Sequence, residues 1–538
     1  MLGAKSHRGP SNMVHQFSQV PKAEIPRSSF DRSHNHKTTL NSGELIPILV
    51  DEALPGDTFK VAMTAFARLT TPIVPIMDNL YMDTHFFAVP LRLVWNNWVK
   101  LNGEQTDPGD STDYTVPQIV APAGGYAVGS VYDHMGLPTG VAAFTHSALF
   151  LRAHNLIYNE WYRDQNLIDS LVVPKDDGPD AYTLYTIQRR GKRHDYFTSA
   201  LPWPQKGPGV EIPLGSSAPI RGLYVTDLAT SAVAGIPLGG GAPGTLSVSN
   251  NGLAYAASKS AAGTVAGTAF NSTNANVYAD LSQATAATIN SLRQAFQLQK
   301  MFERDARGGT RYTEIIRSHF GVTSPDARLQ RPEYLGGGST PVTITPVPQT
   351  SPTGAYANTP QGNLAAMGTM LANGHGFRHS FTEHCIILGY VSIRADLNYQ
   401  QGLNRMWSRK SRFDFYWPAL SHIGEQAVLQ KEIYCDGVPA NDDKVFGYQE
   451  RFAEYRYYPS QITGLFRSQA ALSLDIWHLA QDFATAPVLG KTFIEDHPPV
   501  ERIVAVVDQP QFLMDTYFQM QCSRPMPVYG VPGLIDHF

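Results

Sequence analysis

Residues 57–71, with the sequence DTFKVAMTAFARLTT, decide the fold class of this 538-residue chain. Apolar side chains occupy every second position of the stretch, at Phe59, Val61, Met63, Ala65, Ala67 and Leu69. Polar residues fill most of the positions between them. Because successive side chains of a strand point to opposite faces, this period of two predicts a strand with one buried face.

Similar signals lie on both sides of this stretch. A second strand is expected at residues 81–89, after a turn region at residues 72–78. Near the other end of the chain, a strand is expected at residues 511–522, with one face formed by Phe512, Met514, Phe518 and Met520. The remaining stretches with strand character are residues 340–345, 381–394, 428–434, 445–458 and 500–507.

Helical periodicity is rarer than strand periodicity. Apolar spacing predicts helices at residues 144–161 and 281–304, and Asp280 and Gln283 provide a capping box for the second. Both helices fall inside long excursions between strands, and the strand–helix–strand alternation of a parallel sheet does not occur. The layout predicts a mainly β, antiparallel sandwich or jelly roll with long helix- and loop-containing insertions.

Composition limits the possible functions. The chain is 43% hydrophobic, which supports a large core, but only 16% charged, below the roughly 25% usual for a soluble domain. We therefore expect partners to cover much of its surface. The net charge of −4 argues against a protein that binds nucleic acid through its overall charge, so any such contact is expected to be local. Three widely spaced cysteines and the lack of a signal peptide or membrane-length apolar run indicate a soluble protein made inside the cell.

The composition changes abruptly at residues 207–280. This block holds 12 glycines and only five charged residues, and is rich in Ala, Ser and Thr. A disordered linker is usually more charged and less apolar, so we expect an ordered surface insertion. A shorter loop region is expected at residues 336–338 and 346–360. The chain then divides into a basic arm (1–40), a first part of the jelly roll with a helical insertion (41–206), the insertion (207–280) and the remaining jelly roll with loop insertions and a C-terminal tail (281–538).

The arm at residues 1–40 is basic and lacks apolar periodicity. It has two acidic residues against six cationic ones, which are Lys5, Arg8, Lys22, Arg27, Arg32 and Lys37. Contact with nucleic acid or with neighbouring subunits is one interpretation, and a solvated tail is the other.

The chain shows no pattern of catalytic residues. Gly490, Lys491 and Thr492 end like a phosphate-binding loop, but Thr485 stands where its first glycine is required. His34 and His36 have no acidic or cysteine partner at metal-ligand spacing. GxSxG, HExxH and GxGxxG motifs do not occur. We therefore expect no enzyme, no cofactor and no metal site.

Two clusters combine several cations. Residues 189–194 read RRGKRH, and residues 405–412 contain three arginines and a lysine around Trp407. Such clusters bind single-stranded nucleic acid through phosphate contacts and base stacking, or form salt bridges to a neighbouring segment or subunit. Both interpretations stay open at this point.

Residues 446–459, FGYQERFAEYRYYP, place six aromatic residues among two arginines and two glutamates. Aromatic area beside directional hydrogen-bonding groups is typical of protein interfaces, whereas glutamates beside the rings repel phosphate. We expect a strand of the sandwich framework that is partly core and partly subunit interface. The candidate interface residues are Tyr448, Arg451, Tyr455, Arg456 and Tyr457.

Five separated segments carry a family resemblance: residues 27–57, 66–98, 312–338, 446–468 and 520–538. They include RSSFDRSHNHKTTLNSGELIPILVDEALPGD at residues 27–57 and MQCSRPMPVYGVPGLIDHF at residues 520–538. In these segments the chain resembles the major capsid proteins of the Microviridae, of the gokushovirus type. Residues 207–280 form the main block without a match.

The resemblance implies an eight-stranded antiparallel viral jelly roll. It further implies a T=1 icosahedral shell of sixty copies that encloses a circular single-stranded DNA genome. Residues 207–280 correspond to the insertion that forms threefold surface protrusions in this family, used in host attachment. Their aromatic residues are the candidates for contacts at the protrusion: Tyr224, Tyr255, Phe270 and Tyr278.

Further partners are implied in the same way. They are minor virion proteins and a host-cell surface receptor, without membrane insertion, and the expected location is the virion after assembly in the bacterial host cytoplasm. The six cations of the arm then become candidates for the inner surface, facing DNA. Two alternatives are a single-stranded-DNA-binding or replication protein and a carbohydrate-active jelly-roll enzyme, which needs two carboxylates facing one pocket.

Overall fold

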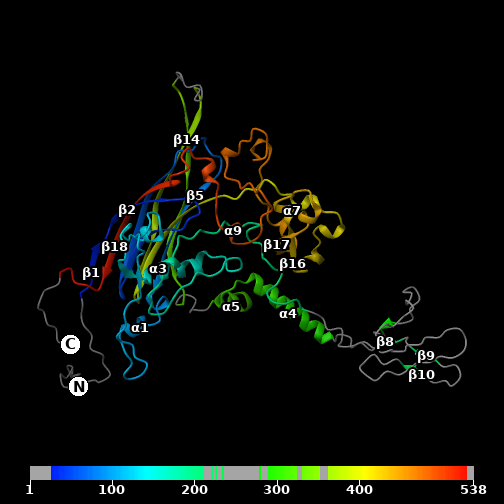
Figure 1. Cartoon of the computed structure of the whole chain (residues 1–538), viewed down its shortest axis with the longest axis horizontal. Helices are drawn as coiled ribbons and strands as arrows, with labels where there is room; N and C mark the ends of the chain where they lie inside the picture. Colours follow the sequence, from blue (N-terminus) through cyan, green and yellow to red (C-terminus); the bar gives the residue numbers. More distant parts are fainter. Residues whose placement is uncertain are drawn as a thin grey trace, which may run out of the picture. The chain divides into compact units, whose positions relative to one another are not determined.

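The computed structural model describes residues 26–210, 289–323, 330–351 and 361–529, and short strands at 220–221, 224–226, 233–235 and 278–279 (Figure 1). The chain divides into two compact units. The first comprises Met1–Pro204 and Ala306–Phe538, and the second comprises Gln205–Asp305.

Two antiparallel sheets form the framework of the first unit. The larger sheet has the order β1-β18-β4-β14-β13, and β2 also pairs with β18. Its strands are β1 (Ser28–Asp31), β2 (His34–Leu40), β4 (Thr58–Leu69), β13 (Thr343–Pro348), β14 (Leu364–Ser380) and β18 (Phe512–Arg524). The second sheet has the order β12-β5-β15-β3. Its strands are β3 (Ile46–Ala53), β5 (Leu80–Pro90), β12 (Glu333–Pro341) and β15 (Cys385–Ala395).

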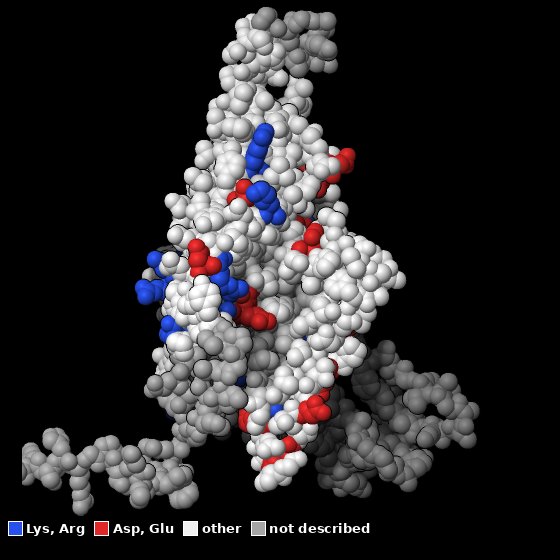
Figure 2. Space-filling view, turned by 90° about the vertical axis from the view of Figure 1, so that its left-hand side faces the viewer, with Lys and Arg blue, Asp and Glu red and all other residues white. Residues whose placement is uncertain are grey.

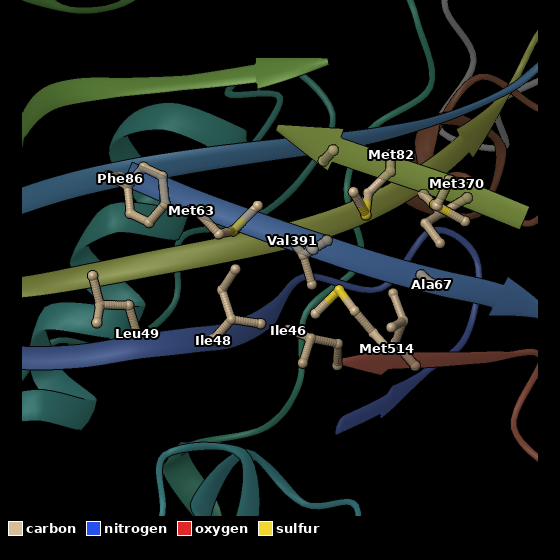
Figure 3. Packing of buried hydrophobic residues seen from close by; sticks show 14 of the residues in the cluster. Ile46, Ile48, Leu49, Met63, Ala67, Met82, Phe86, Met370, Val391 and Met514 are labelled. Carbon is tan, nitrogen blue, oxygen red and sulfur yellow. The ribbon is translucent and has the colours of Figure 1, made fainter. Parts of the chain in front are cut away.

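The apolar face of β4 lies at the centre of the core. Phe59, Met63 and Leu69 are each 0% exposed, as the period of two predicts. Figure 3 shows Met63 beside Phe86 of the other sheet, and Ala67 and Met82 belong to the same buried cluster. Burying a side chain of this size stabilises the fold by about 1.5–3 kcal/mol. The mainly β, antiparallel sandwich class is therefore confirmed, although the two sheets have six and four strands in the described residues, not the expected eight in all.

Strands β4, β5 and β18 match the expected residues 57–71, 81–89 and 511–522 closely. The strand expected at 381–394 begins only at Cys385. The stretch 340–345 is divided between β12 and β13, which meet at Val342.

The glycines at 336–338, expected in a loop, lie in β12. This expectation is wrong because the strand passes very close to β14 of the opposite sheet. A Cβ atom on Gly336 would lie 2.5 Å from the carbonyl oxygen of Gly376, and one on Gly338 would lie 2.4 Å from the His375 ring. Only glycine permits this approach, so the residues that suggest a loop are required by packing between the sheets.

Sheet pairing begins at Ser28, inside the segment expected to be an arm. Strand β1 pairs with the end of β18, with Phe30 opposite Cys522, and β2 pairs with its beginning, with Leu40 opposite Phe512. The polar sequence of β2, HNHKTTL, hides this pairing because most of its side chains are exposed or half-buried.

Shorter elements surround the sheets in the first unit. Two small antiparallel sheets pair β6 (Gln118–Val120) with β7 (Thr145–Ser147) and β16 (Glu425–Leu429) with β17 (Val445–Glu450). The α-helices are α1 (Trp98–Leu101), α2 (Val131–His134), α3 (Leu149–Ile157), α5 (Tyr312–Phe320), α7 (Gln430–Ile433), α8 (Pro439–Asp442) and α9 (Lys491–Ile494). Single turns of other helix types are η1 (Leu91–Leu93), η2 (Tyr158–Tyr162), η3 (Tyr182–Leu184), η5 (Arg405–Ser408), η6 (Arg412–Asp414), η7 (Pro418–Leu420), η8 (Ala453–Tyr455), η9 (Gly464–Phe466), η10 (Asp475–Trp477) and η11 (Val500–Arg502).

Two expected strands are wrong in part or in full. The stretch 428–434 is a strand only to Leu429 and then becomes α7. The stretch 500–507 is not a strand, because it forms the turn η11 and buries Val500, Ile503 and Val504 in the core. Three- and four-residue spacing of these apolar residues suits a helical turn better than a strand.

The helix expected at 144–161 is shorter, because β7 precedes α3 and a wider turn of π type, η2, follows it. The helix expected at 281–304 is α4 (Ile289–Arg307). Its expected capping residues, Asp280 and Gln283, lie outside the described residues.

In the second unit, β9 (Tyr224–Thr226) pairs with β10 (Val233–Gly235), and β8 (Ile220–Arg221) pairs with β11 (Tyr278–Ala279). No helix among the residues described in either unit combines the length and apolarity needed to cross a bilayer.

Candidate functional site

The aromatic run at residues 446–459 begins in β17, outside the two large sheets. Phe446 is 6% exposed and packs against Phe197 and Phe493, and the backbone N–H of Tyr448 donates to the oxygen of Leu201 at 2.8 Å. The expected framework strand through residue 458 is therefore wrong. The strand belongs to a small sheet with β16 and ends at Glu450.

The chain turns sharply at Phe452. This residue has a φ of 64°, a left-handed conformation that costs a non-glycine residue about 1–2 kcal/mol. Its ring is only 3% exposed, and its N–H donates to Oε1 of Gln426 at 3.3 Å. Burying the ring offsets the backbone cost, since a buried phenylalanine contributes about 1.5–3 kcal/mol. The turn directs the following residues toward solvent.

Beyond this turn, aromatic side chains gather at the surface. We name this set the aromatic platform and define it as Trp407, Phe413, Phe415, Tyr416, Trp417, Tyr455 and Tyr457. Their exposed fractions lie between 42% and 73%. Runs of exposed large apolar side chains are rare in soluble monomers unless they bind something.

Specific contacts hold the aromatic platform in place. Arg451 donates from Nη2 to the oxygen of Phe413 at 2.9 Å. The guanidinium of Arg409 lies 4.3 Å from the centre of the Tyr455 ring, and that of Arg412 lies 4.5 Å from Trp417. Such cation–π contacts are worth about 0.5–1 kcal/mol at exposed sites. The rings of Tyr455 and Trp417 are therefore held in position without being covered.

Buried ion pairs support the platform from below. Oε1 of Glu432 lies 2.9 Å from Nη1 of Arg405, and its Oε2 accepts from the Tyr196 hydroxyl at 2.9 Å. Burial raises the pKa of Glu432, an effect that the charge of Arg405 opposes. Glu454 accepts from Gln426 at 2.7 Å and lies 3.6 Å from Arg409. The cluster at 405–412 thus engages carboxylates of its own chain.

The candidate interface residues divide into two groups. Arg451, Tyr455 and Tyr457 hold or belong to the platform, and the half-exposed Arg456 pairs with Glu450 beside them. Tyr448 instead lies in β17, with its backbone bonded to Leu201. The sequence prediction missed the segment 413–417, although its letters, FDFYW, repeat the signal used for 446–459.

The candidate DNA contacts are placed only in part. Lys5, Arg8 and Lys22 lie outside the described residues. Arg32 lies 2.7 Å from Asp51, and Lys37 lies 3.0 Å from Asp515. Arg27 donates to the Thr58 hydroxyl at 2.9 Å.

The basic cluster at 189–194 also finds partners within the chain. Arg190 lies 2.6 Å from Asp83, and Arg193 lies 3.1 Å from Asp396. Lys192 donates to Gln481 at 2.8 Å, and burial lowers its pKa to about 8. These contacts favour the salt-bridge interpretation of the cluster.

The protrusion candidates all belong to the second unit. Tyr224 lies in β9 opposite Gly235, and Tyr278 lies in β11 opposite Arg221. Tyr255 and Phe270 lie outside the described residues.

Two observations bear on the expected absence of an enzyme site. The described residues include no group of His, Cys, Asp and Glu that is suited to hold a metal ion. Glycoside hydrolysis needs two carboxylates facing one pocket. A cavity of about 620 Å³ has Asp164 as the only carboxylate in its lining, whereas a cavity of about 430 Å³ is lined by Asp78, Asp195 and Asp396. The buried Asp83 and Asp180 are held by arginines.

Comparison with known proteins identifies the family. The family model described as "Capsid protein (F protein)" matches residues 18–534. The chain is 49% identical to capsid protein VP1 of Bdellovibrio phage phiMH2K, over 98% of this chain and 99% of that protein. It is 45% identical to capsid protein VP1 of Chlamydia phage 1, over 99% of each chain. It is 38% identical to capsid protein VP1 of Spiroplasma virus 4, over 97% and 98%. An antiparallel β sandwich with an exposed aromatic surface and matches that span the whole chain lead to one conclusion: the chain belongs to the phage capsid protein (F protein) family.

Proposed function

We propose that copies of this structural capsid protein build a closed shell in which the aromatic platform is a contact between subunits. The observation that carries the proposal is the exposure of seven large aromatic side chains, of which Phe415, Trp417 and Tyr455 lie against arginine guanidinium groups. Tyr, Trp and Arg are the residues most enriched where binding energy concentrates in interfaces.

The charge distribution supports an extensive contact surface. Figure 2 shows one side of the molecule as mostly uncharged, with Lys, Arg, Asp and Glu gathered in a few patches. Charged residues are depleted in the centre of protein interfaces. The low charged fraction of 16% has the same explanation, since a shell subunit covers much of its surface with its neighbours.

Assembly of purified protein tests the proposal. The variant Trp407→Ser/Phe413→Ser removes the two most exposed rings of the platform. We expect it to stay folded but to remain monomeric by sedimentation and negative-stain microscopy, where the unchanged protein forms shells. The matched variant Trp407→Phe/Phe413→Tyr keeps the aromatic area and is expected to assemble.

Two results would contradict the proposal in different ways. Shell formation by the serine variant at the normal concentration would remove the platform from the interface. Failure of the unchanged protein to form shells, even with its DNA and accessory virion proteins, would contradict assembly itself.

The finer picture follows from the family resemblance. The shell is a T=1 arrangement of sixty copies around circular single-stranded DNA, assembled in the bacterial host cytoplasm. Minor virion proteins complete the particle. Three cations outside the described residues, Lys5, Arg8 and Lys22, are the leading DNA candidates, because Arg27, Arg32 and Lys37 already have partners in the chain.

The second unit, Gln205–Asp305, is proposed to be the protrusion at the threefold axes that contacts a host-cell surface receptor. The low charge and high glycine content of residues 207–280 support this role, because a small module with little core of its own gains stability by packing against symmetry-related copies. Deleting residues 211–279 is expected to leave shells that form but no longer adsorb to host cells, measured by electron microscopy and a binding assay.

A further inference from the structure

One long segment of the first unit carries acidic residues without any basic ones. Residues 101–151 contain no Lys or Arg, but they contain Glu104, Asp107, Asp110, Asp113 and Asp133. Four of these acids fall in residues 104–113, which we name the acidic loop. Glu104, Asp107 and Asp113 are exposed, and none of the four acids forms an ion pair among the described residues.

The acidic loop has a defined shape. Oδ2 of Asp110 accepts from the N–H groups of Thr106 and Asp107, each at 3.2 Å, and Nε2 of Gln105 donates to the Asp110 oxygen at 2.7 Å. Asp110 thus organises the turn, while the carboxylates of Asp107 and Asp113 have no structural task in the described chain.

Exposed apolar side chains follow the acidic loop in sequence. Val120 ends β6 and is 49% exposed, Val128 is 83% exposed, and Val141 is 48% exposed. A β-bridge between Tyr126 and Thr139 brings the segments with Val128 and Val141 together. The segment from the acidic loop to Val141 therefore carries both exposed acids and exposed apolar side chains.

The aromatic platform has the complementary character. Its rings are accompanied by Lys410 and Arg412, which are exposed and form no ion pair in the part of the chain that the structure describes. Arg405 and Arg409 beside them are occupied by Glu432 and Glu454. Lys410 and Arg412 are thus available for carboxylates that come from outside.

The two surfaces are too far apart to meet within one molecule. Figure 1 shows α1, which precedes the acidic loop, and α7, which contacts the platform through the Arg405–Glu432 pair, on different sides of the first unit. A contact between two different surfaces of identical copies is heterologous, and repetition of such a contact closes rings.

We propose that the acidic loop of one copy docks on the aromatic platform of the next copy. Asp107 and Asp113 then face Lys410 and Arg412. This inference rests on the proposed function, because it assigns the second half of the subunit contact. Complementary charges fix which surfaces meet and in what orientation, whereas like charges at the same place oppose the contact.

Charge exchange tests the pairing. We expect Asp107→Lys/Asp113→Lys and, separately, Lys410→Glu/Arg412→Glu to raise the protein concentration required for shell assembly on the order of 100-fold. Combining all four substitutions in one chain restores the net charge and the complementarity. That chain is expected to assemble within about fivefold of the normal concentration.

The matched control is Glu501→Lys/Asp508→Lys, which changes the net charge as much as the acidic-loop variant does, at exposed positions outside both surfaces. It is expected to assemble normally. Thermal unfolding of each unassembled variant checks that the subunit stays folded.

Several outcomes would overturn the pairing. One is normal assembly of either charge-reversed variant. Another is a combined variant whose required protein concentration rises by the product of the two single increases. Shells that form normally from Lys410→Glu/Arg412→Glu but package no DNA would assign these cations to nucleic acid. In all these cases the unchanged protein still forms shells, so failure of the pairing is distinguishable from failure of assembly.

Discussion

The sandwich core and the aromatic platform use the same kinds of side chain in opposite ways. In the core, Phe86 and Phe518 are 0% exposed, and in the neighbouring helix α3 the fully buried Arg152 is held by Asp180. On the platform, Phe413 is 64% exposed, and the exposed Arg412 lies against a ring with no carboxylate partner among the described residues. In the core, apolar side chains and charges find their partners within one chain. On the platform, apolar side chains stay exposed and a charge lacks a carboxylate partner among the described residues. Stability and assembly are therefore carried by separate regions.

The largest expected effect on stability comes from the buried ion pair of α3. Asp180→Asn removes the buried carboxylate that lies 2.5 Å from Nη2 of Arg152 and leaves this guanidinium with only an exposed carboxylate partner, Asp176. We expect the free energy of unfolding to fall by about 3–5 kcal/mol, measured by urea unfolding of the unassembled subunit.

Asp176 provides the control for this pair. It also lies near Arg152, at 3.4 Å, but its side chain is 79% exposed. Asp176→Asn is expected to change the free energy of unfolding by less than about 0.5 kcal/mol. Equal effects of the two substitutions would contradict the distinction between satisfied core and open surface.

The next largest expected effect is a loss of stability at acid pH. Burial lowers the pKa of His154 to about 4, whereas an unfolded histidine titrates near 6.5. Between these values only the unfolded state gains a proton at this position. The contribution of neutral His154 to the free energy of unfolding is therefore complete above pH 6.5 and is lost as the pH falls to 4. The shift corresponds to about 3 kcal/mol.

Comparison of unfolding at pH 7 and pH 4 measures this effect. His154→Gln cannot titrate and is expected to lose less stability than the unchanged protein over this range. The same loss in the unchanged protein and in His154→Gln would rule His154 out as the acid-sensitive group.

The smallest expected effect on unfolding belongs to the platform. Phe413→Ala is expected to change the free energy of unfolding by less than about 0.5 kcal/mol, because the ring is mostly exposed. The same truncation at Phe86 is expected to cost about 3–5 kcal/mol. A loss above 2 kcal/mol at Phe413 would show that the ring supports the fold and would weaken its assignment to assembly.

The parts of the fold that could be predicted are the strands in which apolar and polar residues alternate regularly. Strands β4 and β18 alternate strictly between buried and exposed positions, so their sequences are sufficient. Strand β14, the longest, has no such signal, because Gly374 and Gly376 interrupt it. A Cβ atom at Gly376 would lie 2.0 Å from the oxygen of Val61. Close packing that demands glycine removes the residues by which a strand is usually identified.

The sequence predicts which types of residue form the candidate site, but not which of these residues are exposed. Residue type alone identifies Arg451, Tyr455 and Tyr457 as contact-forming. Which of the aromatic residues in 446–459 are buried depends on the turn at Phe452, whose left-handed conformation no local rule anticipates for phenylalanine. Before this turn Phe446 is buried and Tyr448 is half-buried, whereas Tyr455 and Tyr457 lie after it and stay exposed.

The position of β18 also governs when a subunit becomes complete. This strand lies between β4 on one side and β1 and β2 on the other, yet roughly 440 residues separate the end of β4 from its start, and synthesis proceeds at about 5–20 residues per second. The ribosome therefore makes β18 tens of seconds after β4, and until then the larger sheet has a gap at its centre. A nascent chain cannot present a finished sandwich to its neighbours. Because of this strand order, the larger sheet is complete, and the subunit is ready to assemble, only after translation has reached β18.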